Sequence, residues 1–579
     1  PEGGRLIFAS NYEKKLELLR FAEPGQRVIF DEDAGKLYLY GSADYAADVC
    51  AEKYADLAAR IAAAKQALTA LDYAAIDAEL EEAEALLAAG EGYDALLRAA
   101  VLLDGLEYKL VPSFAVQDRA AWVAFPGRTA ADVRKTAAYA ESLGLNTLIV
   151  SPFESGYALY DTCLPHLEKH PELAEDTDLL QCYVDECRAR GIRLYFMYCC
   201  FGTQEPSDAY SADHYVNFFA DKLLLNKQGG SVATYYEDSS YSLNPFDAEV
   251  RAWTKDLLAE VAARYDVDGI QLDYIRFPLP NSWGDNYNDH GYNEDMILAF
   301  MEQAQTGVSP KDMRTTDPLW ESWCAFRRDV ITSFVREVSE LLRDTNLIFS
   351  CTCFDDYNDR QMYVYQDVEK WAGEGLIDEL YPMIYAATAE EHIERADEIA
   401  AGIGESCRLV LGLGTYDGQT PAIVSEQAVY NRTAGGNGNS IFALPYTQVF
   451  GFDRLYAEGL YRTPAVHTDD CGAAMPAFLT ELCETIDSTY LYLCPDCGAE
   501  RIREKIAAAA DELAGLGGAA DDESRLAYWQ QAAQTMRSLR EALDEAGVEA
   551  RVQADLLDRM AYIEQIIARN IAAVQRRLR

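Results

Sequence analysis

Hydrophobic and polar positions alternate between two patterns over residues 118–465. Short apolar runs indicate β-strands, and segments with apolar residues three and four apart indicate amphipathic helices between most of them. The predicted strands are 121–125, 147–151, 193–198, 269–273, 347–353, 376–385, 408–413 and 440–444. The predicted helices are 130–143, 179–190, 248–265, 323–342, 389–403 and 421–430.

This alternation predicts an α/β protein with a (β/α)8 TIM barrel, because each parallel strand needs a crossover helix to reach the next. A doubly wound open sheet is the alternative fold. That fold usually carries a glycine-rich phosphate loop after its first strand, and the segment 125–128, Phe-Pro-Gly-Arg, is not such a loop.

The two ends of the chain have different patterns. Residues 1–42 contain two strand-like pieces, 27–30 and 36–40, that suit a β-hairpin. Residues 43–117 form an N-terminal helical segment with two or three amphipathic helices, and residues 466–579 form a C-terminal helical domain broken near 515–518 and 547. We expect these extensions to be scaffold, with a partner- or glycan-binding role as the alternative and a homodimer through their apolar stripes as a further prediction.

The net charge of the chain limits which classes of molecule can be its binding partners. The formal net charge is −46, from 96 acidic and 50 basic residues among 579. Such a surface disfavours nucleic acid and anionic membranes, whereas a neutral polysaccharide is acceptable. No apolar run is long enough to predict a membrane span.

The fourteen cysteines lie mainly in predicted core strands, so buried free thiols are expected. Cys494 and Cys497 form a knuckle that could donate half of a zinc site, with Cys471 and Cys483 completing it. A plain turn or a redox-linked pair is the simpler interpretation, and we predict no metal site.

Acidic side chains follow several predicted strands, at the end of a barrel where active sites lie. A glycosidase needs two carboxyl groups across the scissile bond. Asp273 follows the fourth strand and is the favoured nucleophile or general base, with Arg276 close enough to hold it ionised. Ile270 and Leu272 are expected to face away from it. The expected partner acids, in order of preference, are Asp355, Glu154 and Asp356.

Two unusually long connections, 201–245 and 279–319, leave strand ends and are rich in aromatic residues. Aromatic rings present flat apolar faces to sugar rings, so this enrichment favours a carbohydrate cleft. The residues expected to bind substrate are Tyr157, Tyr274, Arg276, Trp283, Asp356, Tyr385, Tyr416 and Asp417.

Four stretches resemble the glycosyl hydrolase-like 10 family (DUF187) and its relative DUF4015. They are Ala-Trp-Val-Ala at 121–124 with the second-strand region 145–160, Leu-Asn-Pro-Phe-Asp-Ala-Glu-Val-Arg at 243–251 leading to Asp-Val-Asp-Gly-Ile-Gln-Leu-Asp-Tyr at 266–274, the sixth-strand region 366–385, and Leu-Gly-Leu-Gly-Thr-Tyr at 411–416. The resemblance implies a bacterial, usually exported TIM-barrel hydrolase of cell-wall or other complex glycans, with the fourth-strand Asp273 in its cleft. It therefore implies an extracellular or cell-envelope location, with any signal peptide removed before Pro1.

Some cleft positions differ from the family pattern. Tyr274 stands where the family often has a second acid, Met383 where it tends to have Gln, and Tyr157 where it tends to have an acid. Cys199 and Cys200 end the third strand in place of a more polar run.

The predicted function is hydrolysis of a glycosidic bond in a complex bacterial cell-wall, host or dietary glycan by two carboxyl groups. No cofactor is required, because tuned carboxyl groups can make both proton transfers. The alternative is a non-catalytic glycan-binding or surface scaffold protein on a degenerate barrel. A deacetylase or lyase is a third option, and it is disfavoured because none of the six histidines follows a predicted strand.

Overall fold

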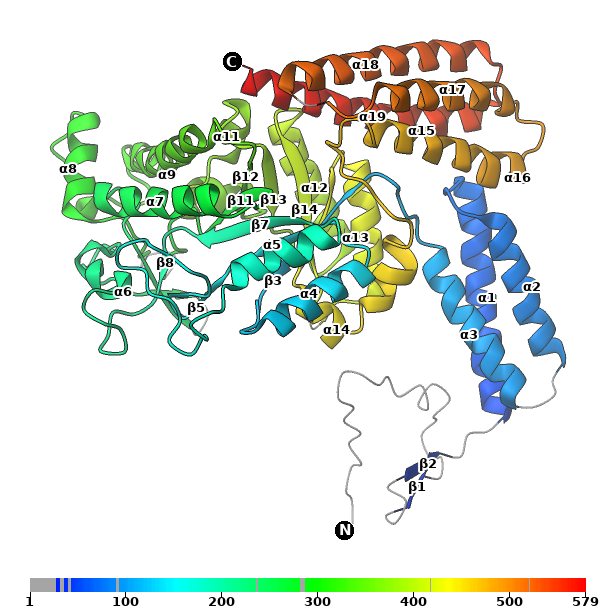
Figure 1. Cartoon of the computed structure of the whole chain (residues 1–579), viewed down its shortest axis with the longest axis horizontal. Helices are drawn as coiled ribbons and strands as arrows, with labels where there is room; N and C mark the ends of the chain where they lie inside the picture. Colours follow the sequence, from blue (N-terminus) through cyan, green and yellow to red (C-terminus); the bar gives the residue numbers. More distant parts are fainter. Residues whose placement is uncertain are drawn as a thin grey trace.

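The computed structural model describes residues 28–31, 36–39, 43–89, 93–235, 238–281, 287–416, 418–519 and 521–578. A closed barrel forms its centre, with helical segments from both ends of the chain beside it (Figure 1). Two predicted site residues, Trp283 and Asp417, lie outside the described residues.

Eight parallel strands close the barrel, which confirms the predicted fold. They are β3 (Asp118–Val123), β4 (Thr147–Val150), β7 (Arg193–Cys199), β11 (Gly269–Asp273), β12 (Ile348–Cys353), β13 (Glu379–Pro382), β14 (Arg408–Gly414) and β15 (Gly438–Phe442). Their order around the barrel is β11-β12-β13-β14-β15-β3-β4-β7, so it follows the order of the sequence. All eight carboxyl ends therefore meet at one mouth.

Helices that follow the strands cover the outside of the barrel. They include α4 (Ala130–Ser142), α5 (Leu179–Ala189), α7 (Ala248–Arg264), α9 (Trp320–Leu342), α12 (Ala389–Ile403) and α13 (Pro421–Thr433). Their starts carry capping side chains: Thr129 and Asp132 form a capping box on α4, and Thr388 accepts a backbone N–H at the start of α12. The helix predicted from residue 323 begins at Trp320, whose ring packs on Arg327 within α9.

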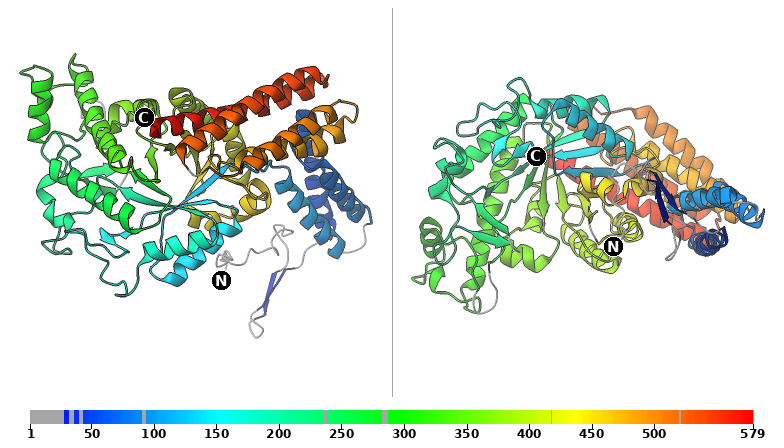
Figure 2. Two further views of the ribbon diagram at one scale, coloured as in Figure 1. Left: turned by 45° about the horizontal axis from the view of Figure 1, so that its top comes forward. Right: turned by 90° about the horizontal axis from the view of Figure 1, so that it is seen from below.

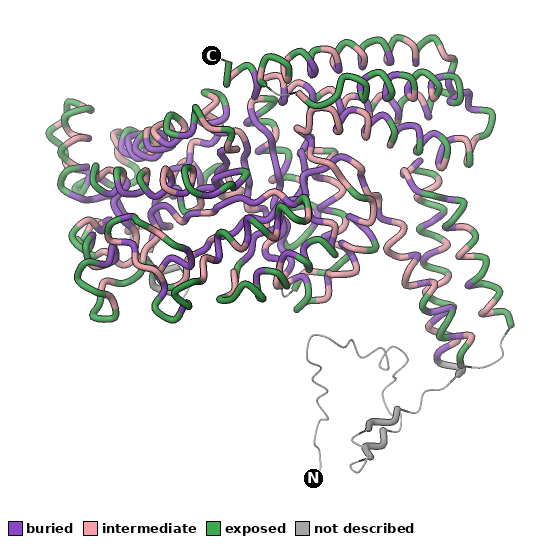
Figure 3. Tube along the Cα trace, viewed as in Figure 1, coloured by how far each residue is buried: buried purple, intermediate pink, exposed green. Residues whose placement is uncertain are grey.

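Alternate residues of β11 face opposite sides of the barrel wall. Ile270 and Leu272 are fully buried in the core between strands and helices, where the tube in Figure 3 is mostly buried. Gln271 faces the interior, where its Oε1 accepts a hydrogen bond from Trp122 Nε1 at 2.7 Å. Asp273 is two residues after Gln271, so its side chain lies on the same face of the strand as that of Gln271. The prediction that Asp273 faces away from Ile270 and Leu272 is therefore confirmed.

The closure between β15 and β3 depends on Gly438. A Cβ atom at this position would lie 1.8 Å from the carbonyl oxygen of Asp118. Since the backbones approach this closely, only glycine fits here.

The N-terminal segment contains β1 (Val28–Asp31) and β2 (Lys36–Leu39), which pair antiparallel. Three helices follow, α1 (Ala43–Ala67), α2 (Tyr73–Ala89) and α3 (Tyr93–Lys109), and they share a core of their own. This bundle projects from one side of the molecule (Figures 1 and 2). The Leu71 N–H donates to Thr489 Oγ1 at 3.2 Å, which ties the bundle to the C-terminal helices.

The C-terminal segment forms a second bundle with its own core. Its elements are α15 (Ala474–Thr485), η7 (Ile486–Tyr490), α16 (Leu491–Leu493), α17 (Glu500–Leu516), α18 (Asp522–Glu545) and α19 (Ala550–Arg577). The breaks after α17 and α18 fall at Gly517 and Gly547, which have positive φ angles of 66° and 62°. Tyr562 of α19 donates to the Gly436 carbonyl at 3.0 Å, in the loop before β15. The bundle therefore packs at the amino ends of the strands, opposite the mouth.

Shorter elements complete the described chain. They are β5 (Phe153–Glu154), β6 (Tyr157–Ala158), β8 (Gly202–Thr203), α6 (Tyr215–Phe218), η2 (Ala220–Lys222), β9 (Ala233–Tyr235), β10 (Asp238–Ser242), α8 (Glu294–Gln303), η4 (Pro310–Asp312), α10 (Tyr357–Asp359), η5 (Arg360–Val364), α11 (Val368–Gly373), α14 (Leu444–Val449) and η6 (Leu455–Leu460). Among the described residues, no helix has both the length and the apolar run that a bilayer crossing requires.

Candidate active site

Asp273 is the last residue of β11 and is held by two hydrogen-bond donors at the barrel mouth. Its Oδ1 accepts from Thr352 Oγ1 of the neighbouring strand β12 at 2.6 Å and from the Tyr274 N–H at 2.7 Å. Tyr274 has a φ of +49°, a left-handed conformation that is uncommon outside glycine. The carboxylate is therefore fixed in one orientation by the strand next to it and by its own backbone.

Asp355 lies just beyond the end of the next strand, β12. Burial raises the pKa of its carboxyl group, the charge of Arg395 opposes that rise, and the pKa stays above its ordinary value. The loop is held by buried Arg360, whose Nη1 donates to the Asp355 carbonyl at 2.8 Å. A carboxyl group that stays protonated to a higher pH suits a general acid.

The Tyr385 phenol lies within electrostatic reach of both acids. Burial raises its pKa, and the negative charges of Asp273 and Asp355 raise it further. Tyr416 Oη donates to the Tyr385 carbonyl at 3.1 Å. Four of the predicted site residues, from strands β11 to β14, thus gather around one part of the mouth.

Glu154, the second choice for the partner acid, is engaged elsewhere. Arg128 grips its carboxylate with Nη2 and Nε, at 2.6 and 2.9 Å. Hydrogen bonding to Arg128 lowers the pKa of Glu154. An exposed carboxylate with a lowered pKa holds its proton poorly, so this environment disfavours Glu154 as the general acid.

Asp356 has a local structural task. It caps α10 by accepting the Asp359 N–H at 3.0 Å, and it pairs with Arg395 Nη1 at 2.6 Å. Burial favours a raised pKa for Asp356, but the Asp359 N–H and Arg395 outweigh burial and lower it. These contacts disfavour Asp356 as a proton donor.

The role of Arg276 in holding Asp273 ionised stays a prediction. No ion pair joins these two described residues. The guanidinium instead lies between two rings, with Cζ 4.6 Å from the Tyr274 ring centre and 4.9 Å from that of Phe354. Attraction to these two aromatic faces holds the guanidinium in this position.

Tyr157 stands apart from the two acids, in an aromatic cluster on the turn after β4. Its ring centre lies 4.7 Å from that of His214 and 5.6 Å from that of Tyr210. Tyr274 is 44 % exposed and lies directly after Asp273. Of these two predicted substrate contacts, Tyr274 is therefore the one placed beside the favoured nucleophile.

A row of aromatic rings leads outward from Tyr385. Tyr385 stacks on Phe442 of β15 with ring centres 4.9 Å apart. Phe442 contacts Tyr446 at 6.1 Å, and Tyr446 contacts Phe450 at 6.0 Å. Phe450 is 39 % exposed, so the row runs from the interior of the barrel to its surface.

The sequence analysis missed three residues that build this site. Thr352 lies between Cys351 and Cys353 in a predicted strand, and alternation along that strand could have placed its hydroxyl inside the barrel. Phe442 could have been found in the same way. Gln366 is buried, accepts the Phe354 N–H at 3.0 Å and donates to the Thr352 carbonyl at 3.2 Å, and its only sequence signal is its place at the start of the family-like stretch 366–385.

The described residues include no group of three or more His, Cys, Asp or Glu side chains arranged to hold a metal ion. The four cysteines of the zinc alternative have other surroundings: Cys483 Sγ donates to the Arg503 carbonyl at 3.7 Å, and Cys497 is buried at the start of α17. The zinc alternative is therefore not supported. All fourteen cysteines are free thiols in the structure, and thirteen of them are buried or half-buried.

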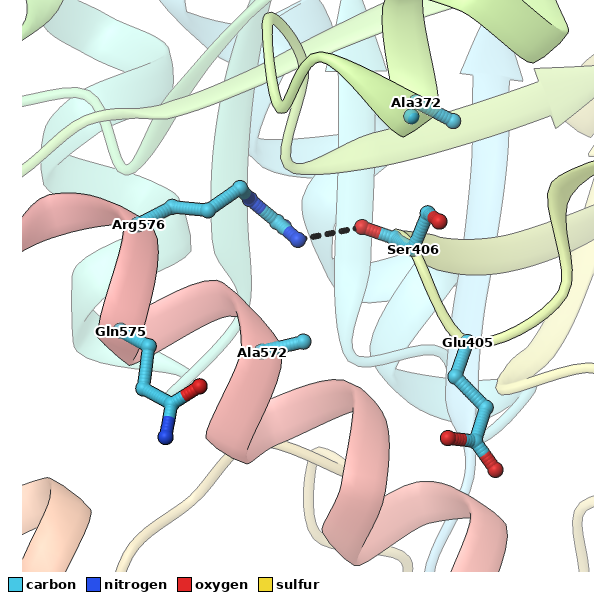
Figure 4. A pocket seen from close by; sticks show the side chains of 7 residues that line it. Ala372, Glu405, Ser406, Ala572, Gln575 and Arg576 are labelled. Atoms are coloured by element: carbon cyan, nitrogen blue, oxygen red, sulfur yellow. Dashed lines mark hydrogen bonds between the residues drawn. The ribbon is translucent and has the colours of Figure 1, made fainter.

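A separate hollow of about 290 Å³ lies at the other end of the barrel (Figure 4). It is lined by the end of α11, the loop before β14, and α19, from which Arg576 donates to the Ser406 carbonyl. Its position at the amino ends of the strands separates it from the candidate acids.

Comparison with known proteins assigns the class of this barrel. The glycosyl hydrolase-like 10 family model matches residues 115–431, which contain the barrel from its first strand to within α13. The fold is thus that of a TIM barrel of glycoside-hydrolase type. The chain belongs to the glycosyl hydrolase-like 10 family.

Individual relatives are distant. Glycosyl hydrolase DigH of Escherichia coli is 23% identical over 272 residues, which cover 42% of this chain and 55% of that protein. An S-layer-related protein of Niallia circulans is 26% identical over 189 residues, which cover 30% of this chain and 11% of that protein. The matches thus span about half or less of these relatives.

Solved structures with a similar fold include glycoside hydrolases. The PgaB (BpsB) glycoside hydrolase domain of Bordetella bronchiseptica aligns with a TM-score of 0.43 and 11% identity, over 59% of this chain and 99% of that domain. The catalytic domain of the Paenibacillus polymyxa β-amylase aligns with a TM-score of 0.43 and 11% identity, over 60% and 99%.

Proposed function

We propose that this protein hydrolyses O-glycosidic bonds by a two-carboxylate mechanism in which Asp273 and Asp355 act together. The observation that carries the proposal is that Asp273 ends β11 and Asp355 follows the neighbouring parallel strand β12, so both acids lie at the same end of the barrel. One acid is oriented by two donors, and the other has a pKa raised by burial. Pairs of carboxyl groups with different environments divide the acid and base roles in glycosidases.

In this mechanism Asp355, protonated, donates its proton to the oxygen of the leaving sugar. Asp273 is the nucleophile of a retaining reaction or the general base of an inverting one. The Thr352 hydroxyl and the Tyr274 N–H hold the Asp273 carboxyl group in one orientation, because both donate to its Oδ1. The anomeric configuration of the first product distinguishes the two outcomes.

The aromatic row gives the sugar chain a surface to lie on. Tyr385 begins the row beside the acids and Phe450 ends it in solvent. Ring faces suit the apolar faces of sugars, and no charge on the sugar is needed for that contact. We therefore propose that the substrate extends from the acids across β15 and α14.

The substrate class we propose is a complex glycan of a bacterial cell wall, a host or the diet, as the family membership suggests. The match to a protein named glycosyl hydrolase DigH supports hydrolysis, although it covers only part of that protein. An extracellular or cell-envelope location remains part of this proposal, and fractionation of the cells that make the protein tests it.

One observation favours a second candidate, a glycan-binding protein without activity. Tyr274 and Tyr157 occupy positions where the family tends to have acids, and the Glu154 carboxylate is held in an ion pair by Arg128. On this candidate, the barrel binds glycans through its aromatic row and cleaves none of them.

A digestion experiment separates the two candidates. The wild-type protein and Asp273→Asn are incubated with a panel of cell-wall, host and dietary glycans, and new reducing ends are counted. We expect release by the wild type on at least one glycan and a loss of several powers of ten in Asp273→Asn. Binding without release by either protein would contradict the hydrolase and favour the second candidate.

A further inference from the structure

Arg276 is held rigidly at the barrel mouth between the exits of β11 and β12. Its guanidinium is sandwiched by the rings of Tyr274 and Phe354, at 4.6 and 4.9 Å. Tyr274 follows Asp273 directly and Phe354 precedes Asp355 directly. The two rings thus fix a positive charge between the segments that carry the two proposed catalytic acids.

This charge has no acid partner among the residues that the structure describes. Other arginines at the mouth are paired: Arg128 with Glu154, and Arg395 with Asp356. Arg276 Nη1 makes one long hydrogen bond, 3.4 Å, to the Phe277 carbonyl. Its Nε is buried without a hydrogen-bond partner. A guanidinium has five N–H donors, so most of its capacity is unused.

Arg276 also lies close to the proposed reaction centre. Cys199 of β7 is the registered neighbour of Asp273 in the barrel wall. Burial raises the pKa of the Cys199 thiol, the charge of Asp273 adds to the rise, and the charge of Arg276 opposes it. The charges of Arg276 and Asp273 therefore both influence the pKa of the Cys199 thiol.

We propose that Arg276 binds a carboxylate carried by the sugar next to the cleaved bond. The inference rests on the proposed function and names the substrate class more closely. A planar guanidinium matches a carboxylate in two parallel hydrogen bonds, and its two flanking rings already hold it in place.

The net charge of the chain limits which acidic glycan fits. A surface with a formal charge of −46 repels a chain with a carboxylate on every sugar. The single guanidinium of Arg276 can pair with one carboxylate at a time. The substrate therefore carries isolated carboxylates separated by neutral sugars, and the neutral sugars lie on the aromatic row.

Binding to matched glycans tests this proposal without turnover. The Asp273→Asn protein is titrated with heteropolysaccharides that carry one uronic acid per repeat, and with the same polymers after reduction of their carboxyl groups to alcohols. The ionic strength is about 0.15 M, where the screening length of about 8 Å suppresses repulsion from distant acids. Sulfated neutral glycans form a third arm, which separates a carboxylate from another anion.

We expect at least one acidic polymer to bind ~10–100-fold more tightly than its reduced form, the range for a hydrogen bond to a charged group. Adding Arg276→Gln removes this preference, and Arg276→Lys keeps part of it because the charge remains. The matched control is Arg128→Gln, which removes an arginine that is already paired and leaves the preference intact. Thermal unfolding of each variant reports whether it is folded.

Three results would overturn the proposal. The acidic and reduced polymers bind equally, no acidic polymer binds, or the preference for the acidic polymer persists in the Arg276→Gln variant. Stronger binding of the sulfated arm would assign the cation to another anion. Failure of the proposed function is separate, because it shows as absence of hydrolysis by the wild type while the carboxylate preference persists.

Discussion

Asp355 differs from the other acids at the mouth in what surrounds its carboxyl group. Glu154 and Asp356 each form an ion pair with an arginine at 2.6 Å. Asp355 interacts with Arg395 through the longer-range attraction of their charges. Burial therefore dominates at Asp355 and raises its pKa. This contrast is why Asp355 is the acid that we propose as the proton donor.

The pH dependence of activity tests this assignment. A general acid must be protonated, so kcat/KM falls as the pH rises through the pKa of Asp355. Arg395 lowers that pKa, so its loss raises it. We expect Arg395→Gln to move the alkaline limb of the kcat/KM profile to higher pH. A limb that moves to lower pH, or that stays in place in a folded variant, contradicts the assignment.

At the residue scale, the sequence predicted positions better than partners. The facing of Asp273 followed from strand alternation, since side chains alternate with a period of two. The aromatic neighbours of Arg276 did not, because Phe354 comes from the loop after a different strand, β12. The pairing of Glu154 with Arg128 joins two different strand-end loops, and their approach depends on the folded barrel.

At the scale of elements, α14 turns the end of β15 into an extended aromatic surface. Tyr446 and Phe450 are four residues apart, so they lie on the same side of the helical turn. Phe442 connects them to Tyr385. The row therefore depends on one short element that follows the last strand of the barrel.

Chain-length dependence tests the aromatic row. Phe450→Ala removes the outermost ring, so long oligosaccharides lose a contact that short ones never make. We expect KM to rise about 2- to 10-fold for long substrates, since one stacking contact is worth about 0.5–1.5 kcal/mol, with KM unchanged for the shortest substrate cleaved. Phe218→Ala is the matched control, because Phe218 has a similar exposed fraction, 38 %, and stacks on His166 outside the row.

An equal rise for short and long substrates would contradict this path for the glycan, as would a similar effect of Phe218→Ala.

The elements themselves were predictable because a parallel barrel repeats one unit. Most of the strands are buried runs rich in apolar residues, and most of the helices that cover the barrel begin at a capping residue such as Thr129 or Thr388. The short α14 was not predicted, because its six residues are too few to show a helical period. The row of rings was therefore outside what the sequence could reveal.

At the scale of the whole molecule, the C-terminal bundle and the candidate site lie at opposite ends of the barrel. Arg569 Nη1 donates to the Gly435 carbonyl and to Asn437 Oδ1, in the loop before β15. Asn570 donates to the Thr468 carbonyl at 2.9 Å. The bundle therefore closes the amino end of the barrel and leaves the mouth open. A homodimer through the helical segments remains a prediction, which sedimentation can check.

This separation predicts that bundle contacts affect stability and not catalysis. Arg569→Ala leaves buried acceptors in the loop before β15 without their donor, at a cost of about 1–3 kcal/mol each. We expect a lower free energy of unfolding with kcat and KM per folded molecule unchanged. An altered KM at unchanged stability would place the bundle in the site.

If Asp273 and Asp355 divide the chemistry between them, substrates with different leaving groups separate their two roles. Wild type, Asp273→Asn, Asp355→Asn and Glu154→Gln are compared on the natural glycan and on an aryl glycoside whose leaving group needs no proton. We predict that Asp355→Asn loses about 10²–10⁴ in kcat on the glycan, the range for general acid catalysis, and little on the aryl glycoside. Asp273→Asn loses activity on both substrates, and Glu154→Gln keeps it on both. Equal losses on both substrates for Asp355→Asn, or full activity of Asp273→Asn, would contradict the account.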